Sequence, residues 1–219
     1  MIGGISRMKI GIIGSGGVAQ TLGAGYLAKG YEVMLGTRDP AKLAEWLAAA
    51  GEHAGVGSFA DAARFGDVLF LSVNPAAIES AVELAGLENF ADKTLIDLTN
   101  PMDFFAGVPP RFTATVGNSL GEIVQRMLPD ANVVKAFNSI GVAVMTDPLF
   151  DGEAATHFIA GDNDAAKAEA TALICEFGWE VVDVGGIEQS FFLEALASLW
   201  VNYAFKSGNW NQAFRLLSR

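Results

Sequence analysis

The sequence contains almost no cysteine or histidine. Cys175 is the single cysteine, and His53 and His157 are the two histidines. One cysteine excludes a disulfide within the chain, and the place of Cys175 among the apolar positions of a predicted helix favours a buried thiol over a nucleophile. No Cys/His spacing typical of metal ligands occurs, so we expect no metal site. Neither histidine has a motif partner, and we interpret both as structural or solvated.

Basic residues are also scarce. The chain has 14 Lys and Arg against 25 Asp and Glu, a net charge of −11. Nucleic acids are bound through clustered lysine and arginine, so this excess of acid argues against a nucleic-acid partner. The sequence also lacks a long uninterrupted apolar run and a basic-then-apolar leader, so we expect no membrane partner and a cytoplasmic location.

A glycine-rich turn follows the first predicted strand. The segment Lys9–Ala19 reads KIGIIGSGGVA, with an apolar strand that ends at Gly14 and a helix that begins near Val18. Backbone N–H groups and the positive helix end then face the turn, an arrangement that binds the pyrophosphate of a dinucleotide. The alternative is an ordinary strand–helix connection. The predicted cofactor-binding residues of this turn are Gly14, Ser15, Gly16, Gly17, Val18 and Ala19.

The end of the second apolar strand, Glu32–Leu35, indicates which dinucleotide is bound. An NAD site usually carries Asp or Glu here, which binds the ribose 2′-hydroxyl and repels a 2′-phosphate. In this chain Gly36 is followed by Thr37, Arg38 and, one helical turn later, Lys42. These side chains can hydrogen-bond and neutralise a phosphate, so we expect NADP. In the alternative interpretation the two basic residues are simply solvated.

Polar residues follow three later predicted strands. They are Asn74-Pro75, Thr99-Asn100-Pro101 and Asn138. The carboxyl ends of parallel strands meet at one edge of a sheet, where ligands of open α/β sheets bind. We interpret Asp97 as a carboxylate that satisfies backbone groups at its strand end. Asp103 lies beside Phe104 and Phe105, a pair that could stack on a flavin ring, although packing of one Phe in the core is the commoner outcome.

The order of strands and helices predicts an α/β protein with a Rossmann-type, doubly wound, mostly parallel sheet, helices on both faces and a C-terminal helical segment. We assign residues 1–7, which carry no periodic pattern, to a disordered or added extension. Residues 8–186 form the predicted NADP-binding domain. Residues 187–219, helical from Gln189 to Leu217, would pack on this domain or on a dimer partner.

The chain resembles one family over nearly its whole length: the NADP-dependent oxidoreductases that include the coenzyme F420:NADP oxidoreductases and the cytosolic domain of membrane ferric reductases. The sequence VKAFN followed by SI is the most particular of the matching motifs. The matching stretches are Met8 to Lys42, Ser72-Val73-Asn74-Pro75, Asp97 to Met102, Val133 to Ile140, Phe158 to Asp162 and Asp183 to Gly186.

This resemblance implies hydride transfer between NADPH and a small-molecule acceptor, F420 in some members and FMN or FAD in others. It also implies a homodimer built through the C-terminal helices. By position, NADP would be held by Ser15, Thr37, Arg38 and Lys42 at its phosphates and by Ser72, Val73, Asn74, Thr99, Asn100 and Pro101 along its length, with Met102, Asn138 and Ile140 at the acceptor.

The acceptor stays open at this point. Asn138 stands where the archaeal F420 enzymes are expected to have histidine, and the Thr99-Asn100-Pro101 loop looks more like the ferric-reductase domain. Hydride transfer needs no nucleophile or strong base because the cofactors carry the chemistry, so no catalytic residue is assigned.

Two other functions also stay open. An NADP-dependent dehydrogenase of the hydroxyacid or imine-reducing type has a similar first domain, but it builds half its site from a large helical second domain. The roughly 30 residues after Gly186 are too few for one. A protein that binds NADP as a redox sensor without turnover would need the same binding residues. Turnover with a flavin, deazaflavin or keto acid discriminates these possibilities.

Overall fold

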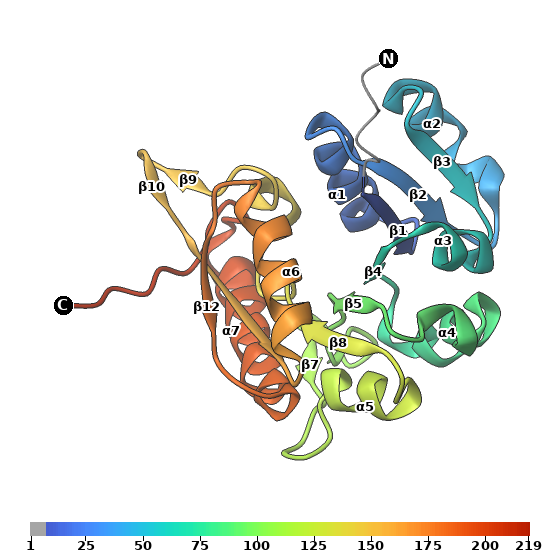
Figure 1. Ribbon diagram of the computed structural model, residues 1–219. Coiled ribbons are helices and arrows are strands. Elements are labelled where there is room, and N and C mark those ends of the chain that lie inside the picture. Colours follow the sequence, from blue (N-terminus) through green and yellow to red (C-terminus); the bar gives the residue numbers. More distant parts are fainter. Residues whose placement is uncertain (1–7) are drawn as a thin grey trace.

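The structure, a computed structural model, describes residues 8–219, so the extension predicted at residues 1–7 lies outside the described residues. An eight-stranded sheet runs in the order β12-β11-β8-β5-β4-β1-β2-β3 (Figure 1). Neighbouring strands are parallel except β11 and β8, which confirms the predicted doubly wound, mostly parallel fold. The strands are β1 (Lys9–Ile13), β2 (Glu32–Gly36), β3 (Ala54–Gly57), β4 (Val68–Leu71), β5 (Thr94–Asp97), β8 (Asn132–Lys135), β11 (Thr156–Gly161) and β12 (Glu180–Asp183).

Helices cover both faces of this sheet (Figure 1). None of the helices within residues 8–219 combines the length and the apolar character that crossing a membrane requires. The α-helices are α1 (Gly17–Ala28), α2 (Ala44–Ala50), α3 (Phe59–Phe65), α4 (Ile78–Ala85), α5 (Leu120–Met127), α6 (Asp164–Cys175) and α7 (Ser190–Ser207). Short 3-10 helices are η1 (Pro40–Leu43), η2 (Pro75–Ala77), η3 (Leu87–Phe90), η4 (Val142–Val144) and η5 (Ile187–Gln189), and two small hairpins pair β6 (Met102–Asp103) with β7 (Arg111–Phe112) and β9 (Leu149–Phe150) with β10 (Glu153–Ala154).

Local sequence explains where several helices begin. Ser58 and Ser119 are the N-caps of α3 and α5, and each hydroxyl accepts the backbone N–H of an acidic residue three positions later. Those carboxylates, Asp61 and Glu122, accept the cap's own N–H in return, which satisfies two helix-end donors at once. The central strands β4 and β5 are buried along their whole length. Burial on both faces explains why β4 is a continuous apolar run rather than an alternating one.

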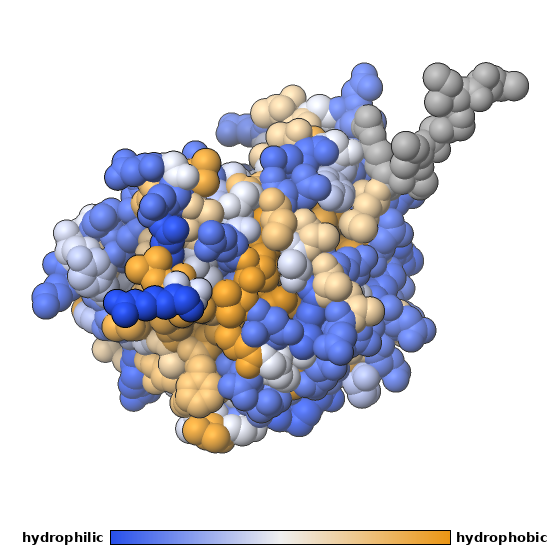
Figure 2. Space-filling view, turned by 60° about the vertical axis from the view of Figure 1, so that its left-hand side comes forward, coloured by the Kyte–Doolittle hydropathy of each residue, from blue (hydrophilic) through white to orange (hydrophobic). Residues whose placement is uncertain are grey.

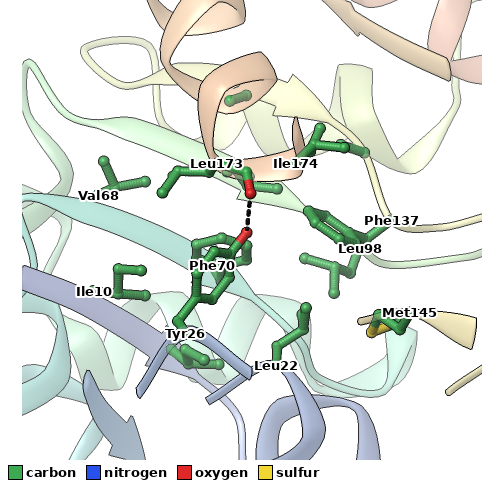
Figure 3. Close-up of a cluster of buried hydrophobic side chains, with 14 of the residues drawn as sticks. Ile10, Leu22, Tyr26, Val68, Phe70, Leu98, Phe137, Met145, Leu173 and Ile174 are labelled. Carbon is green, nitrogen blue, oxygen red and sulfur yellow. Dashed lines mark hydrogen bonds between the residues drawn. The ribbon is translucent and has the colours of Figure 1, made fainter. Parts of the chain in front are cut away.

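Tyr26 of α1 links the two halves of the sheet through one of the two buried clusters. Its ring lies 5.5 Å from that of Phe70 in β4 and 4.7 Å from that of Phe177 beyond α6. Its hydroxyl donates a hydrogen bond of 3.3 Å to the carbonyl of Leu173 in α6 (Figure 3). Helices α1 and α6 are therefore fixed on the same face, while α3, α4 and α5 cover the other.

The C-terminal segment is less helical than predicted. Helix α7 ends at Ser207, and Gly208 adopts a left-handed conformation with φ of 70°. The side chains of Ser207 and Asn209 then accept the next backbone N–H groups, which stops the helix. Beyond this turn the chain runs beside β11, where Phe214 accepts the N–H of Thr156 at 2.9 Å. The prediction of a helix to Leu217 is wrong because β11 offers backbone partners that a helix would forgo.

Cys175 is exposed, whereas the sequence predicted a buried thiol. It is the last residue of α6, and its neighbours Leu173 and Ile174 occupy the buried face together with Phe177. One further step of 100° around the helix carries Cys175 out of that face. The apolar phase of this helix therefore ends one residue before the cysteine.

Candidate functional site

The turn between β1 and α1 contains Gly14 and Gly16, which have different surroundings. The Gly14 N–H donates to the Gly36 carbonyl at 3.1 Å, and a Cβ at Gly14 would lie 2.1 Å from the Ser72 carbonyl oxygen. Gly16 is the N-cap of α1, without a side-chain cap, and a Cβ at Gly16 would meet no protein atom within 4 Å. Gly14 is therefore required by the packing of β1 against β4, and Gly16 faces open space at the start of the helix.

A hollow of about 260 Å³, here called the Arg38 hollow, lies in front of this turn. It is bounded by the carboxyl ends of β1, β2 and β4 and by the first turns of the helices that follow them. The Arg38 hollow is lined by Gly14, Ser15, Gly16, Thr37, Arg38, Asp39, Lys42, Phe59, Ser72, Val73, Asn74, Ala77, Ser80 and Ala81.

All four predicted phosphate ligands line this hollow, and Thr37, Arg38 and Lys42 differ in their burial and hydrogen bonding. Thr37 is buried, and its hydroxyl accepts the Asp39 N–H at 3.2 Å. The Lys42 ammonium lies 3.9 Å from the Asp39 carboxylate, which also caps η1 through the N–H of Ala41. Arg38 is exposed and makes no hydrogen bond or ion pair with any residue between 8 and 219. Its guanidinium is thus available to a ligand in the Arg38 hollow.

A second opening, the Asn138 cleft, continues from the first along the carboxyl edge of the sheet. The two share four residues at the ends of β1 and β4: Gly16, Ser72, Val73 and Asn74. Most other walls of the cleft are apolar, and α7 contributes Val201. The Asn138 cleft is lined in addition by Gly17, Val18, Pro75, Leu98, Thr99, Asn100, Met102, Phe104, Phe137, Asn138, Ile140, Met145 and Val201.

Two asparagines in the wall of the cleft hydrogen-bond to each other. The Asn138 side-chain NH₂ donates to Asn100 Oδ1 at 3.1 Å and to the Leu193 carbonyl at 2.9 Å. In return, the Asn100 NH₂ donates to the Asn138 carbonyl at 2.7 Å. Asn138 is 6% exposed, and within residues 8–219 its Oδ1 has no hydrogen-bond partner. An unpaired buried acceptor costs about 1–3 kcal/mol, so a ligand that donates an N–H here would remove that penalty.

An unusual backbone conformation presents Asn138 to the cleft. Phe137 has a φ of 58°, a region that bulky residues rarely adopt. Its N–H donates to Nε2 of His157 at 2.8 Å. Burial lowers the pKa of His157 to about 3, so the ring stays neutral and Nε2 remains an acceptor. His157 is therefore structural, as the sequence suggested, and it supports the turn at the end of β8.

A buried ion network lies behind the same loops. The Lys135 ammonium in β8 is 2.9 Å from the carboxylate of Asp97 in β5 and 2.8 Å from that of Glu194 in α7, and all three side chains are 0% exposed. It also donates to the Thr99 carbonyl. Burial disfavours the ammonium ion, but the two carboxylates outweigh it and raise the pKa of Lys135, which therefore stays charged.

Some predicted residues lie behind the site rather than in it. Ala19 and Pro101 are buried and line neither opening. Ala19 is fully buried between α1 and the sheet, consistent with close helix–strand packing.

Phe104 and Phe105 are both exposed, whereas one of them was expected in the core, and Phe104 lines the Asn138 cleft. The hairpin of β6 and β7 carries them away from the sheet, with Asp103 paired to Arg111 at 3.2 Å.

Comparison with known proteins supports one family. Residues 9–101 match the model of the family described as coenzyme F420-dependent NADP oxidoreductase. A crystal structure from Arthrobacter sp. FB24, provisionally assigned as an F420-dependent NADP reductase, shares 35% identity, covers 96% of this chain and 100% of that one, and superposes with a TM-score of 0.90. The F420-dependent NADP reductase of Methanocaldococcus jannaschii is 28% identical over 91% of this chain and 95% of its own length.

The chain belongs to this family. It is accordingly an NADP-dependent oxidoreductase, as the sequence predicted. The rat metalloreductase STEAP3 is also similar, 27% identical over 86% of this chain, but the chain spans only 36% of its length. The names of these two groups of relatives state different partners, F420 for the NADP reductases and a metal for the metalloreductases.

Sequence reasoning missed several residues of this oxidoreductase. Phe137, Met145 and Val201 line the Asn138 cleft but were not predicted to do so. Phe137 belongs to the VKAFN motif, in which only Asn138 was chosen as a site residue, whereas Met145 and Val201 lie in apolar stretches without a motif. Lys135 and Glu194 were missed as partners because 59 positions separate them along the chain. A lysine inside an otherwise apolar strand was the available signal, since a buried lysine requires a partner.

Gly16→Val is expected to abolish binding of both NADPH and NADH while lowering the thermal unfolding midpoint by only a few degrees, since valine is a poorer N-cap residue than glycine. The valine side chain would fill the space in front of α1, yet its Cβ would meet no protein atom within 4 Å. Isothermal titration calorimetry measures the two affinities, and thermal unfolding provides the control for folding. NADPH affinity equal to that of the wild type would show that no pyrophosphate approaches this turn.

Proposed function

We propose that the protein transfers a hydride between NADPH and a flavin or deazaflavin acceptor of the F420, FMN or FAD type. NADP would extend from the Arg38 hollow into the Asn138 cleft, and the acceptor would stack at the outer side of that cleft. The observation that carries this proposal is the continuity of the two openings over Gly16 and residues 72–74, at the carboxyl edge of the sheet. Ligands of open α/β sheets bind at this edge.

The Arg38 hollow suits the adenosine and phosphate half of NADP. At the end of β2, where NAD sites usually carry Asp or Glu, this chain has Gly36. The nearby Asp39 caps η1 and pairs with Lys42. The unpaired guanidinium of Arg38 can bind two oxygens of a 2′-phosphate at once, with Lys42 adding a second positive charge. In a chain with a net charge of −11, this local excess of basic groups favours a phosphate ligand.

The Asn138 cleft suits the nicotinamide half. A nicotinamide carries a carboxamide whose NH₂ can donate to the unpaired Oδ1 of Asn138. Apolar walls such as Val18, Ile140 and Met145 give its ring a dry surface. These features fit the cofactor that the family implies.

The residues of this chain would act by positioning. Bound NADPH supplies the hydride, and the acceptor receives it with its electron pair. Asn100 and Asn138 hold each other in place and fix one face of the cleft. Met102, Phe104 and Ile140 shield the transfer from water, and the 55% exposed ring of Phe104 offers a surface for a planar acceptor at the rim. No acid or base is required.

We also propose a homodimer built on α7. Phe192, Leu199 and Tyr203 lie on one side of this helix, at spacings of seven and four residues, and are 62%, 59% and 56% exposed. Figure 2 shows hydrophobic residues gathered on the side of the molecule that carries β12 and α7. A contiguous apolar face of this kind typically marks a protein interface.

Arg38→Ala should weaken NADPH binding by roughly ten- to a hundredfold, the range of one charge-assisted contact, and leave NADH binding nearly unchanged. The arginine is expected to contact the 2′-phosphate, which NADH lacks. Calorimetric titration of both cofactors measures this difference. Arg126→Ala, an exposed arginine that lines neither opening, is the matched control and should change neither affinity. An equal loss for the two cofactors would contradict the phosphate assignment.

A panel of acceptors tests the reaction itself. NADPH oxidation is followed at 340 nm with F420, FMN, FAD, an imine and a keto acid in turn. We expect turnover with a flavin or deazaflavin. Turnover confined to the imine or keto acid would favour a dehydrogenase of the second type, and tight NADPH binding without any turnover would favour a redox sensor.

Leu199→Glu should convert the proposed dimer to a monomer, because it places a charge in the centre of the apolar face of α7. Analytical ultracentrifugation measures the mass in solution. The matched control is Leu84→Glu in α4, a leucine that is 56% exposed against 59% for Leu199. A wild-type protein that sediments as a monomer at high concentration would refute the dimer.

A further inference from the structure

The buried network of Lys135, Asp97 and Glu194 carries more negative than positive charge. All three N–H groups of the Lys135 ammonium are used, toward the two carboxylates and the Thr99 carbonyl. Asp97 Oδ1 accepts the N–H of Thr99 at 2.9 Å and its hydroxyl at 2.7 Å. Glu194 accepts two further backbone N–H groups, at 3.1 and 3.0 Å, from the first turn of α5.

This pattern of donors indicates that both carboxylates are ionised. Each of their four oxygens accepts a hydrogen bond from a backbone N–H group or from the Lys135 ammonium, and these groups donate but cannot accept, as is expected around charged carboxylates. The positive end of α5 and the ammonium ion stabilise the two anions. With one ammonium against two carboxylates, the network keeps a formal charge of −1 that water does not reach.

The network lies directly behind the walls of the Asn138 cleft. Two residues after Asp97 the chain reaches Thr99, and three residues after Lys135 it reaches Asn138, both of which line the cleft. From α7, the carbonyl of Leu193, next to Glu194, accepts a hydrogen bond from the Asn138 side chain. The charge is therefore held close to the position proposed for the nicotinamide ring.

We infer that this buried negative charge favours the oxidised form of the bound nicotinamide, so that the site promotes hydride donation from NADPH to the acceptor. The inference rests on the proposed function. When the hydride leaves with its electron pair for the acceptor, the nicotinamide ring gains a charge of +1. A fixed anion behind the cleft lowers the energy of that cation and leaves the neutral dihydronicotinamide unaffected, because a protein interior screens charge far less than water does.

The test compares the affinities of NADP⁺ and NADPH for the full chain by calorimetric titration. Glu194→Gln keeps the shape of the side chain and removes one negative charge. The ratio Kd(NADP⁺)/Kd(NADPH) is expected to rise by roughly three- to tenfold, the range for a unit charge about 10 Å away at intermediate screening. Glu188→Gln is the matched control. It removes the same charge at an exposed position in η5 and should leave the ratio unchanged.

Asp97→Asn is the second variant, and it removes a charge from the opposite side of Lys135. The inference requires both variants to shift the ratio in the same direction. Equal weakening of NADP⁺ and NADPH, or an unchanged ratio, would show that the network only supports the structure, and would overturn the inference while the proposed function stands. A wild-type protein that binds neither cofactor would instead overturn the proposed function.

Discussion

The ammonium ion of Lys135 is the constraint on which the candidate site depends. A buried charge is tolerated only when each of its hydrogen-bonding groups has a partner, and breaking such a network by removing one member typically costs about 3–5 kcal/mol. Here the partners come from β5, from the loop after it and from α7, while Glu194 also binds the first turn of α5. The Lys135 side chain thereby holds α7 against the carboxyl ends of the strands and fixes the position of the loop at Thr99.

Charge is distributed unevenly along this edge of the sheet, and the distribution follows the chemistry of a dinucleotide. At the end of β2, exposed basic side chains such as Arg38 lie in solvent. There they are free to move toward the proposed phosphate, and dissolved salt screens their attraction to it. At the ends of β5 and β8, the charges are buried and fixed, and the groups that face the cleft are amides and apolar side chains. Flexible cations are suited to binding, and a rigid, dry cleft is suited to aligning two rings.

The sequence was sufficient for those parts that local rules determine. The glycine turn with Thr37 and Arg38 predicted a phosphate site at the place where the Arg38 hollow lies, because that prediction depends only on residues that are neighbours along the chain. The missed features depend on tertiary contacts. Glu194 can be recognised as the partner of Lys135 only when α7 is packed beside β8, and the extended course of Phe214 depends on the unpaired edge at Thr156. Helical periodicity likewise could not indicate that the apolar face of α6 ends before Cys175.

The turn at Phe137 shows how the core and the cleft are coupled. A left-handed conformation at a bulky residue costs on the order of 1–2 kcal/mol and persists only when its surroundings require it. At this position the neutral ring of His157 accepts the Phe137 N–H, and that ring is itself packed edge-on between Phe137 and Trp179, at 4.5 and 5.1 Å. A regular strand would carry residue 138 onward along β8. The left-handed turn instead directs Asn138 back toward Asn100, so the packing of an aromatic core positions an amide in the wall of the cleft.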